Sequence, residues 1–373
     1  MMGKNKIRQG AALLLALAAG ALPFAAPERC TQALEEGLCL CSGPLLLSLF
    51  PFLIVSALLI QCPAADVLGL PFRPAARLAG VRAPAAGKVM LMGFLGGFAP
   101  AAAAAARAVE TGQLAPEEAD DLLPACVCSG PSFVVLTVGR SMLGSTELGV
   151  LLFLAQVAAG WLSAALLARS RARQPRPTGP LPYQRPPCPA AEELRLDRVV
   201  ARAARTYGTL CAFVLFFRML AAGAAGLLPA GAGTLCAMLL EVYSGCDLAA
   251  RSGRFASTLC CAALSFQGLS VLLQVRTICP PQMTLAPLYR ARLLHLPLSV
   301  LLFHLLLPQG AQQAFGPLQG PITTLQRLHP DHMLVVFLGC SYAVCELSRT
   351  LAAAQPEPKR PQPASRRKLQ DRP

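Results

Sequence analysis

Long apolar stretches separated by short polar segments run along the whole chain. Stretches close to the length that crosses a hydrocarbon core of roughly 30 Å are 43–62, 125–143, 148–167, 207–228, 255–276 and 332–348, with a shorter one at 293–307. Another apolar run, inside residues 1–26, follows Lys4, Lys6 and Arg8. We expect an uncleaved helix there, a signal peptide being the alternative, because cleavage after Ala26 would place Phe24 where a small residue is needed. The pattern predicts an all-α integral membrane protein with about eight transmembrane helices.

Two more apolar segments contain residues that interrupt a helix. Residues 89–106 include Gly96, Gly97 and Pro100, and residues 231–250 contain Glu241 and Asp247 in a largely apolar, glycine-containing run. Lipid offers no replacement hydrogen bonds to a broken helix, so we expect the first segment to be a re-entrant hairpin buried in protein. An ordinary kinked helix is the alternative, because membrane helices tolerate Gly and Pro. The second segment is predicted to be broken in the same way.

The two halves of the chain repeat one layout. Gly130-Pro-Ser-Phe-Val-Val135 aligns with Gly268-Leu-Ser-Val-Leu-Leu273. The first copy enters the membrane from outside at Gly43 and the second from inside at Tyr207, which predicts an inverted-topology repeat with two re-entrant hairpins. Inverted repeats with broken helices are typical of secondary transporters, whose substrate site lies near the midplane where the repeats meet.

Basic residues mark the cytoplasmic segments in this layout. An acidic loop precedes residue 43, a basic loop follows residue 62, and nine arginines lie between 169 and 205, which fits the positive-inside rule with both termini cytoplasmic. The predicted divisions are a transmembrane helix with an external loop (1–42), the first repeat (43–168), an Arg- and Pro-rich linker (169–206), the second repeat (207–310), a final transmembrane helix (311–350) and a basic disordered tail (351–373).

Composition narrows the function classes further. Hydrophobic residues make up 54% and charged residues 14% of the chain, too few charges for a water-facing surface all round. The net charge of +14 is concentrated beside apolar segments and no nucleic-acid motif accompanies it, so the expected partner is the lipid bilayer and not nucleic acid. We expect no enzyme activity, no cofactor and no metal, because Cys126 and Cys128 lack a histidine or second cysteine pair at metal spacing and no nucleophile has a histidine partner.

Polar residues inside the apolar segments are the candidate site. They are costly in a bilayer and often mark a substrate or ion path. They gather in Leu239-Leu-Glu-Val-Tyr-Ser-Gly-Cys-Asp-Leu248 and in Ala263-Leu-Ser-Phe-Gln-Gly-Leu-Ser-Val-Leu-Leu-Gln274, with a weaker copy around 96–100 and 128–133. The alternative is structural: serines let helices approach closely, and Glu241 could pair with Arg218.

The chain resembles the sporulation integral membrane proteins of the YlbJ (SpoVV) family, which contain two nucleoside-recognition Gate domains. The resemblance covers about residues 45–307. It rests on Ser48-Leu-Phe-Pro-Phe-Leu-Ile-Val-Ser56, Glu110-x-Gly-Gln-Leu114, Ser129-Gly-Pro-Ser-Phe-Val-Val-Leu-Thr-Val-Gly139, Leu240-Glu-Val-Tyr-Ser-Gly245 and Ser265-Phe-Gln-Gly-Leu-Ser270. A more distant likeness is to concentrative nucleoside transporters, in which two hairpins and two broken helices enclose substrate and coupling ion.

The resemblance implies transport of dipicolinic acid or a similar small anion across the outer forespore membrane of a spore-forming bacterium, by alternating access. Sodium and proton remain open as coupling ion, and so does a homo-oligomeric state. Arg140 and Arg218 are the expected buried cations that would face an anion, unless they snorkel or pair with Glu241 or Asp247. The substrate-binding residues that the likeness implies are Gly97, Phe98, Pro100, Ser129, Gly130, Ser132, Glu241, Tyr243, Ser244, Gly245, Gln267, Gly268 and Ser270.

One departure from the family pattern keeps other functions open. The family's first hairpin reads near Gly-Tyr-Pro-x-Gly-Ala-Lys, whereas this chain has Gly97-Phe-Ala-Pro-Ala-Ala-Ala103. If the missing lysine contacts the anion in relatives, this chain uses another cation or another substrate. The alternatives are therefore a nucleoside-type solute transporter and a non-transporting scaffold for spore envelope assembly.

Overall fold

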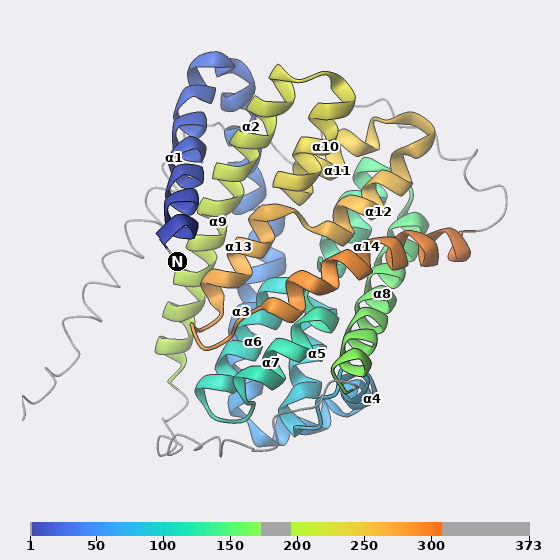
Figure 1. Cartoon of the computed structure of the whole chain (residues 1–373). Helices are drawn as coiled ribbons and strands as arrows, with labels where there is room; N and C mark the ends of the chain where they lie inside the picture. The colour runs from blue at the N-terminus through green and yellow to red at the C-terminus, as the bar shows by residue number, and fades with distance from the viewer. Residues whose placement is uncertain (1, 173–194, 308–373) are drawn as a thin grey trace, which may run out of the picture.

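The computed structural model describes residues 2–172 and 195–307, which form helices and no strands (Figure 1). The first range contains α1 (Met2–Ala25), α2 (Pro27–Ser42), α3 (Pro44–Gln61), η1 (Pro63–Val67), η2 (Leu70–Phe72), α4 (Arg73–Leu78), α5 (Pro84–Gly96), α6 (Phe98–Glu110), α7 (Pro116–Cys126), η3 (Ser132–Met142) and α8 (Thr146–Ala172). The second contains α9 (Leu196–Leu227), α10 (Ala230–Leu240), α11 (Val242–Ala250), η4 (Gly253–Phe255), α12 (Ala256–Phe266), α13 (Gly268–Ile278) and α14 (Ala286–Leu306). The predicted all-α class is confirmed for these ranges.

Within the described ranges, four helical segments are long and apolar enough to cross a membrane. They are Pro44–Gln61, Thr146–Arg171, Leu196–Leu227 and Ala256–Ile278, and they match the predicted spans 43–62, 148–167, 207–228 and 255–276. The predicted spans 1–26 and 293–307 are helical too, as α1 and α14. The predicted span 332–348, the tail 351–373 and most of the linker 169–206 lie outside the described residues.

The first half of the chain contains two interruptions. Only Gly97, at φ 81°, separates α5 from α6, and the two helices pack against each other, so the predicted break in 89–106 is confirmed. The predicted span over 125–143 is not one continuous helix. Helix α7 ends at Cys126, a non-helical stretch follows, and η3 is then wound as a π-helix. Pro131 explains the interruption, because it has no N–H to donate to the preceding turn.

The second half is interrupted twice in the same order. Glu241 adopts an extended conformation between α10 and α11, which pack against each other, so the predicted break in 231–250 is confirmed. The predicted span 255–276 is also divided, because Gln267 at φ 67° and Gly268 at φ 73° turn the chain between α12 and α13. A left-handed conformation at Gln267, which has a β-carbon, carries a steric cost.

Each half therefore consists of a helix, a pair of helices joined at a break, an interrupted helix and a last helix. The two breaks of one half lie against each other. A β-carbon on Gly97 would stand 2.5 Å from the nitrogen of Gly130, and one on Gly268 would stand 2.9 Å from the nitrogen of Glu241. In Figure 1 the α5–α6 pair lies at the bottom of the molecule and the α10–α11 pair at the top, so the two pairs approach the centre from opposite ends.

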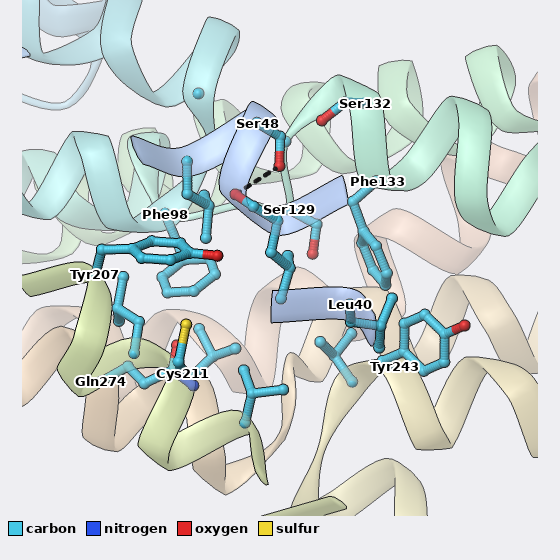
Figure 2. Close-up of a pocket in the computed structure, with 18 of the residues that line it drawn as sticks. Leu40, Ser48, Phe98, Ser129, Ser132, Phe133, Tyr207, Cys211, Tyr243 and Gln274 are labelled. Atoms are coloured by element: carbon cyan, nitrogen blue, oxygen red, sulfur yellow. Dashed lines mark hydrogen bonds between the residues drawn. The ribbon is translucent and has the colours of Figure 1, made fainter. Parts of the chain in front are cut away.

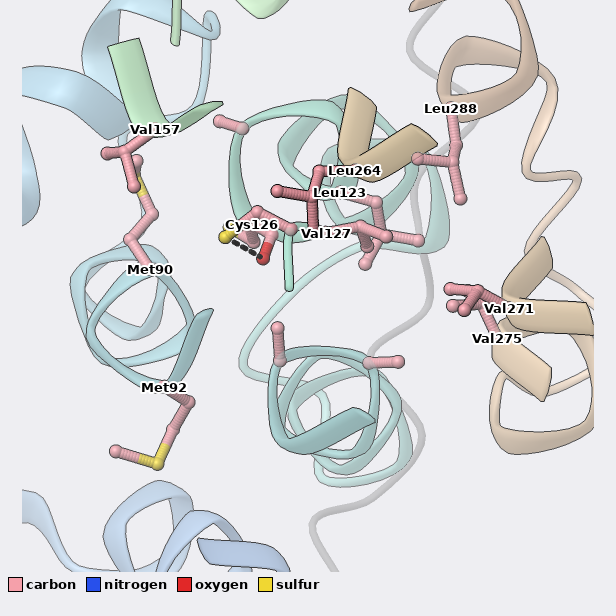
Figure 3. Close-up of a cluster of buried hydrophobic side chains, with 14 of the residues drawn as sticks. Met90, Met92, Leu123, Cys126, Val127, Val157, Leu264, Val271, Val275 and Leu288 are labelled. Atoms are coloured by element: carbon pink, nitrogen blue, oxygen red, sulfur yellow. Dashed lines mark hydrogen bonds between the residues drawn. The ribbon is translucent and has the colours of Figure 1, made fainter. Parts of the chain in front are cut away.

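The core fills the space between these elements with small and medium apolar side chains. Residues from α5, α7, α8, α12, α13 and α14 belong to one buried cluster, part of which is drawn in Figure 3. Helix α6 contributes fully buried alanines, which allow neighbouring backbones to approach closely: Ala101, Ala102, Ala104, Ala105 and Ala108. Close packing of this kind holds the broken segments in place without large side chains.

Polar contacts join the two halves at the end of the molecule where α4 and the last turn of α8 lie. Helix α7 begins at Pro116 and carries Glu117 and Glu118 in its first turn, where acidic side chains suit the positive end of the helix dipole. Further along the same helix, Asp120 is buried and accepts hydrogen bonds from the backbone N–H groups of Thr284 (2.8 Å) and Leu285 (3.1 Å). The carboxylate thus anchors the loop between α13 and α14 to the first half of the chain.

Candidate functional site

A cavity of about 70 Å³ lies where the chain breaks of the two halves meet (Figure 2). Its volume holds roughly five water molecules. The lining residues come from α2, α3, both helix pairs, the first interrupted helix, α9 and α13: Leu40, Leu45, Ser48, Leu49, Gly96, Phe98, Ser129, Gly130, Ser132, Phe133, Tyr207, Leu210, Cys211, Val214, Glu241, Val242, Tyr243, Val271 and Gln274. Apolar and aromatic side chains predominate, with a few polar groups among them, which is the usual character of a small-molecule site.

The first half contributes the tip of the α5–α6 pair and the start of η3. Phe98 opens α6 and Ser132 opens η3, and neither helix has a side chain that caps its N-terminus by a hydrogen bond. The first N–H groups of a helix lack intrahelical acceptors and carry partial positive charge. Ser129 lies beside them on the cavity wall, in the neighbourhood of Ser48 of α3, whose hydroxyl donates to the carbonyl of Leu45 at 3.4 Å (Figure 2). This wall therefore offers hydroxyls together with two uncapped helix N-termini.

The second half contributes Glu241 and the start of α11. The carboxylate of Glu241 accepts hydrogen bonds from the backbone N–H of Tyr243 (2.8 Å) and of Ser244 (2.7 Å) and from the hydroxyl of Ser244 (2.9 Å). It is 3% exposed, so the helix N-terminus and these three donors compensate for its burial. The predicted pairing of Glu241 with Arg218 is not found; Glu241 caps α11.

Helices α9 and α13 supply lining residues that the sequence prediction left out. Gln274 donates from Nε2 to the hydroxyl of Ser270 at 3.0 Å and lines the cavity from α13. Tyr207 and Cys211 line it from α9, and the Tyr207 hydroxyl donates to the carbonyl of Cys41 on α2. Spacing could have indicated Gln274, because it follows Ser270 by four residues and so shares its face of α13.

Six of the residues predicted to bind substrate line the cavity, and the others lie near it. Those on the wall are Phe98, Ser129, Gly130, Ser132, Glu241 and Tyr243. Gly97 and Gly268 are at the crossings of the breaks, Pro100 is buried in α6, and Gly245 packs where a β-carbon would lie 2.6 Å from the α-carbon of Met238. Ser244 and Ser270 do not line the cavity, but they hydrogen-bond to the lining residues Glu241 and Gln274.

Gln267 differs from the other predicted residues. Its side chain is fully buried, and both polar atoms of its amide lack a hydrogen-bond partner among the described residues. Such an amide is costly. It lies at the second break, next to Gly268, but it does not line the cavity.

The two arginines expected to be buried cations behave differently from each other. Arg140 is exposed, so the expectation that it is buried is wrong; it lies on the outer face of η3. Arg218 is 3% exposed, but its partner is Glu36 of α2, at 2.6 Å, and not Glu241 or Asp247. Asp247 pairs instead with Arg251 at 3.0 Å. The lining residues therefore include one carboxylate and no lysine or arginine.

A second buried polar cluster, absent from the sequence prediction, lies around Arg292 of α14. Arg292 is 3% exposed and donates to the carbonyl oxygens of Ser265 (3.1 Å) and Val127 (2.5 Å). These carbonyls stand at the C-terminal ends of α12 and α7, where the helix dipoles place partial negative charge. His295 joins the same cluster, with Nδ1 3.1 Å from the oxygen of Ser265 and Nε2 2.9 Å from that of Gln156. Arg292 thus connects the interrupted helices of the two halves.

In the ranges that the structure describes, no group of three or more His, Cys, Asp and Glu side chains could hold a metal ion. His295 and His304, nine residues apart on α14, have separate surroundings, because His304 lies beside Thr258.

Comparisons with known proteins give no relative for this chain. No protein-family model matches it, and no curated protein or solved structure matches it either.

Proposed function

We propose that the protein is a secondary transporter that moves a small organic anion, such as dipicolinic acid, across a membrane by alternating access. The observation that carries the proposal is one partly polar cavity, within otherwise apolar helices, that three of the four chain breaks line, with the fourth break packed against Glu241. Irregular backbone at membrane depth is tolerated where it is buried in protein or lines a cavity. Broken helices at the meeting of two repeats are a common construction for transporter binding sites.

The arrangement of the halves supports an inverted repeat. The α5–α6 and α10–α11 pairs approach the centre from opposite ends (Figure 1), as two re-entrant hairpins entering from opposite sides of a membrane would. The basic loop that holds Arg73, Arg77 and Arg82 lies at the same end as the last turns of α8, which carry Arg169 and Arg171. By the positive-inside rule this end is cytoplasmic. The full proposal is about eight spans and two hairpins, with both termini cytoplasmic.

The cavity wall from the first half supports an anionic or acceptor-rich substrate. The uncapped N-termini of α6 and η3 and the hydroxyls of Ser129 and Ser132 are donors that suit carboxylate oxygens. Room for roughly five water molecules corresponds to a single ring with small substituents. The resemblance to the sporulation family adds dipicolinic acid as the example and the outer forespore membrane as the location.

An uncharged nucleoside-type solute is the second candidate. The observation in its favour is the charge of the wall, which has Glu241 but neither lysine nor arginine. The rings of Phe98, Phe133 and Tyr243 could stack on a base. The cavity volume is less favourable, because a nucleoside adds a sugar to its ring.

The test is uptake by proteoliposomes that contain the purified chain, with labelled dipicolinate, excess uridine as competitor and empty liposomes as control. We expect saturable uptake that uridine does not reduce. Inhibition by uridine, with uptake of uridine itself, would favour the second candidate. Absence of uptake of both solutes under sodium and proton gradients, by protein shown to be folded, would refute transport and favour a scaffold.

Two substitutions test whether the cavity is the substrate-binding site. We expect Glu241→Gln and Ser132→Ala to impair uptake at unchanged expression, because the first weakens the cap of α11 and the second removes a wall hydroxyl. The matched controls are Glu147→Gln at the start of α8 and Ser141→Ala near the end of η3, whose side chains are exposed. Normal uptake by both site variants would show that the cavity is not the binding site.

A further inference from the structure

Helix α9 carries a charged residue directly beyond the cavity wall. Tyr207, Cys211 and Val214 line the cavity from one face of α9, and Arg218 follows one turn later on the same face. Arg218 itself is not on the wall. Its position is therefore just outside the cavity, at the end where the second helix pair reaches it.

The guanidinium of Arg218 is only partly satisfied. Nη2 pairs with Glu36 at 2.6 Å and Nε donates to the carbonyl of Ala33 at 3.4 Å. Nη1 is buried and has no hydrogen-bond partner among the described residues. A buried donor without an acceptor is unfavourable, and a guanidinium can bind a carboxylate through two parallel N–H groups.

Tyr243 separates this donor from the cavity. The guanidinium carbon lies 4.4 Å from the centre of the Tyr243 ring, a cation–π contact. Tyr243 lines the cavity, where it packs against Phe133 with ring centres 6.0 Å apart (Figure 2). Tyr243 is therefore the side chain that stands between the guanidinium of Arg218 and the cavity.

We propose that Arg218 is the subsite for a carboxylate of the transported solute, and that Tyr243 screens it in the conformation described here. The inference rests on the proposed transport function. A carboxylate moved out of water needs a compensating charge, and the wall itself offers no cation. Glu36 balances Arg218 before the solute binds, and because its side chain is 48% exposed it returns to water at little cost.

The experiment compares two ring-matched solutes in the same proteoliposomes: pyridine-2,6-dicarboxylate and the uncharged pyridine-2,6-dicarboxamide. We expect Arg218→Met to raise the KM for the dicarboxylate at least tenfold and to leave the KM for the dicarboxamide unchanged. The control is Arg205→Met, an exposed arginine on the same helix. We expect it to change neither KM.

Glu36→Gln provides an independent reading if Arg218→Met does not fold. It removes the competing carboxylate while Arg218 keeps its charge, so we expect a several-fold lower KM for the dicarboxylate alone. A structural ion pair predicts the opposite: both variants would raise the KM for both solutes. That result, or an unchanged KM for the dicarboxylate in Arg218→Met, would overturn the subsite while transport stands. Failure of the unmodified protein to take up either solute would overturn the transport function and the subsite with it.

Discussion

The role of Arg292 gives the sharpest test of how the two halves are held together. Its guanidinium is the donor to the carbonyl of Val127 at the end of α7 and to that of Ser265 at the end of α12. Arg292→Met keeps most of the side-chain volume and removes both hydrogen bonds together with the charge. The Ser265 oxygen keeps His295 as a neighbour, at 3.1 Å, whereas no other hydrogen bond to the Val127 oxygen is found within the described residues.

The magnitude follows from these partners. A hydrogen bond from a charged donor contributes about 1.5–3 kcal/mol, and a buried carbonyl left unpaired costs about 1–3 kcal/mol. Removal of the buried charge recovers some desolvation free energy, which offsets part of this loss. We therefore expect Arg292→Met to lower the free energy of unfolding by about 2–4 kcal/mol. Arg292→Lys should lose about half of that, because an ammonium cannot reach two carbonyls with the geometry of a planar fork.

The assay is reversible unfolding from mixed micelles by increasing the fraction of sodium dodecyl sulfate, followed by the fluorescence of Trp161. Trp161 is the only tryptophan of the chain and packs on the core from α8, next to the interrupted helices. Arg290→Met, an exposed arginine on the same helix, is the control and should be neutral. If Arg292→Met is as stable as this control, the guanidinium does not stabilise the ends of α7 and α12, and the structural role inferred for Arg292 is wrong.

Three further changes test other parts of the structure. Gly268→Ala should lower the free energy of unfolding by about 1–3 kcal/mol, because φ is 73° and the new β-carbon would lie 2.9 Å from the nitrogen of Glu241. Its control is Gly208→Ala, which has open space around it and should be neutral or stabilising in the same assay. Asp120→Asn should speed hydrogen exchange of the Thr284 and Leu285 amides, which its carboxylate binds; unchanged exchange there would contradict the anchor. Gln274→Leu should raise the KM for the transported solute several-fold at unchanged stability, since it replaces a polar wall group, and an unchanged KM would place Gln274 outside the site.

The breaks could be predicted in part because some residues cannot continue a helix. Gly97 acts through its own backbone, so the local sequence indicates that break. Pro131 acts in the same way, but the apolar stretch 125–143 around it is long enough to predict a span. The break at Glu241 has no proline, and it was indicated only by a carboxylate in an apolar run. Gln267 gave a polar signal of the same kind, but its left-handed conformation depends on the crossing with Leu240 and Glu241, which no local pattern specifies.

The ion pairs could not be predicted, because they join residues far apart in the chain. Arg218 was matched with the nearest acidic residues of its own half, whereas the fold places Glu36 beside it from α2. Arg292 was overlooked for another reason. It stands beside an apolar run, where an arginine usually marks the membrane boundary, and its partners are backbone carbonyls, which leave no trace in the sequence.

The cavity and the cluster around Arg292 lie at oppositely charged helix ends of the breaks. Every break exposes the negative end of one helix and the positive end of the next. Arg292 donates hydrogen bonds to carbonyls at the negative ends of α7 and α12, while the positive ends of α6, η3 and α11 line the cavity. Only α11 has its own anion there, in Glu241. The positive ends of α6 and η3 have no such anion among the described residues. An anionic solute in the cavity would balance these positive ends, as Arg292 balances the negative ends of α7 and α12.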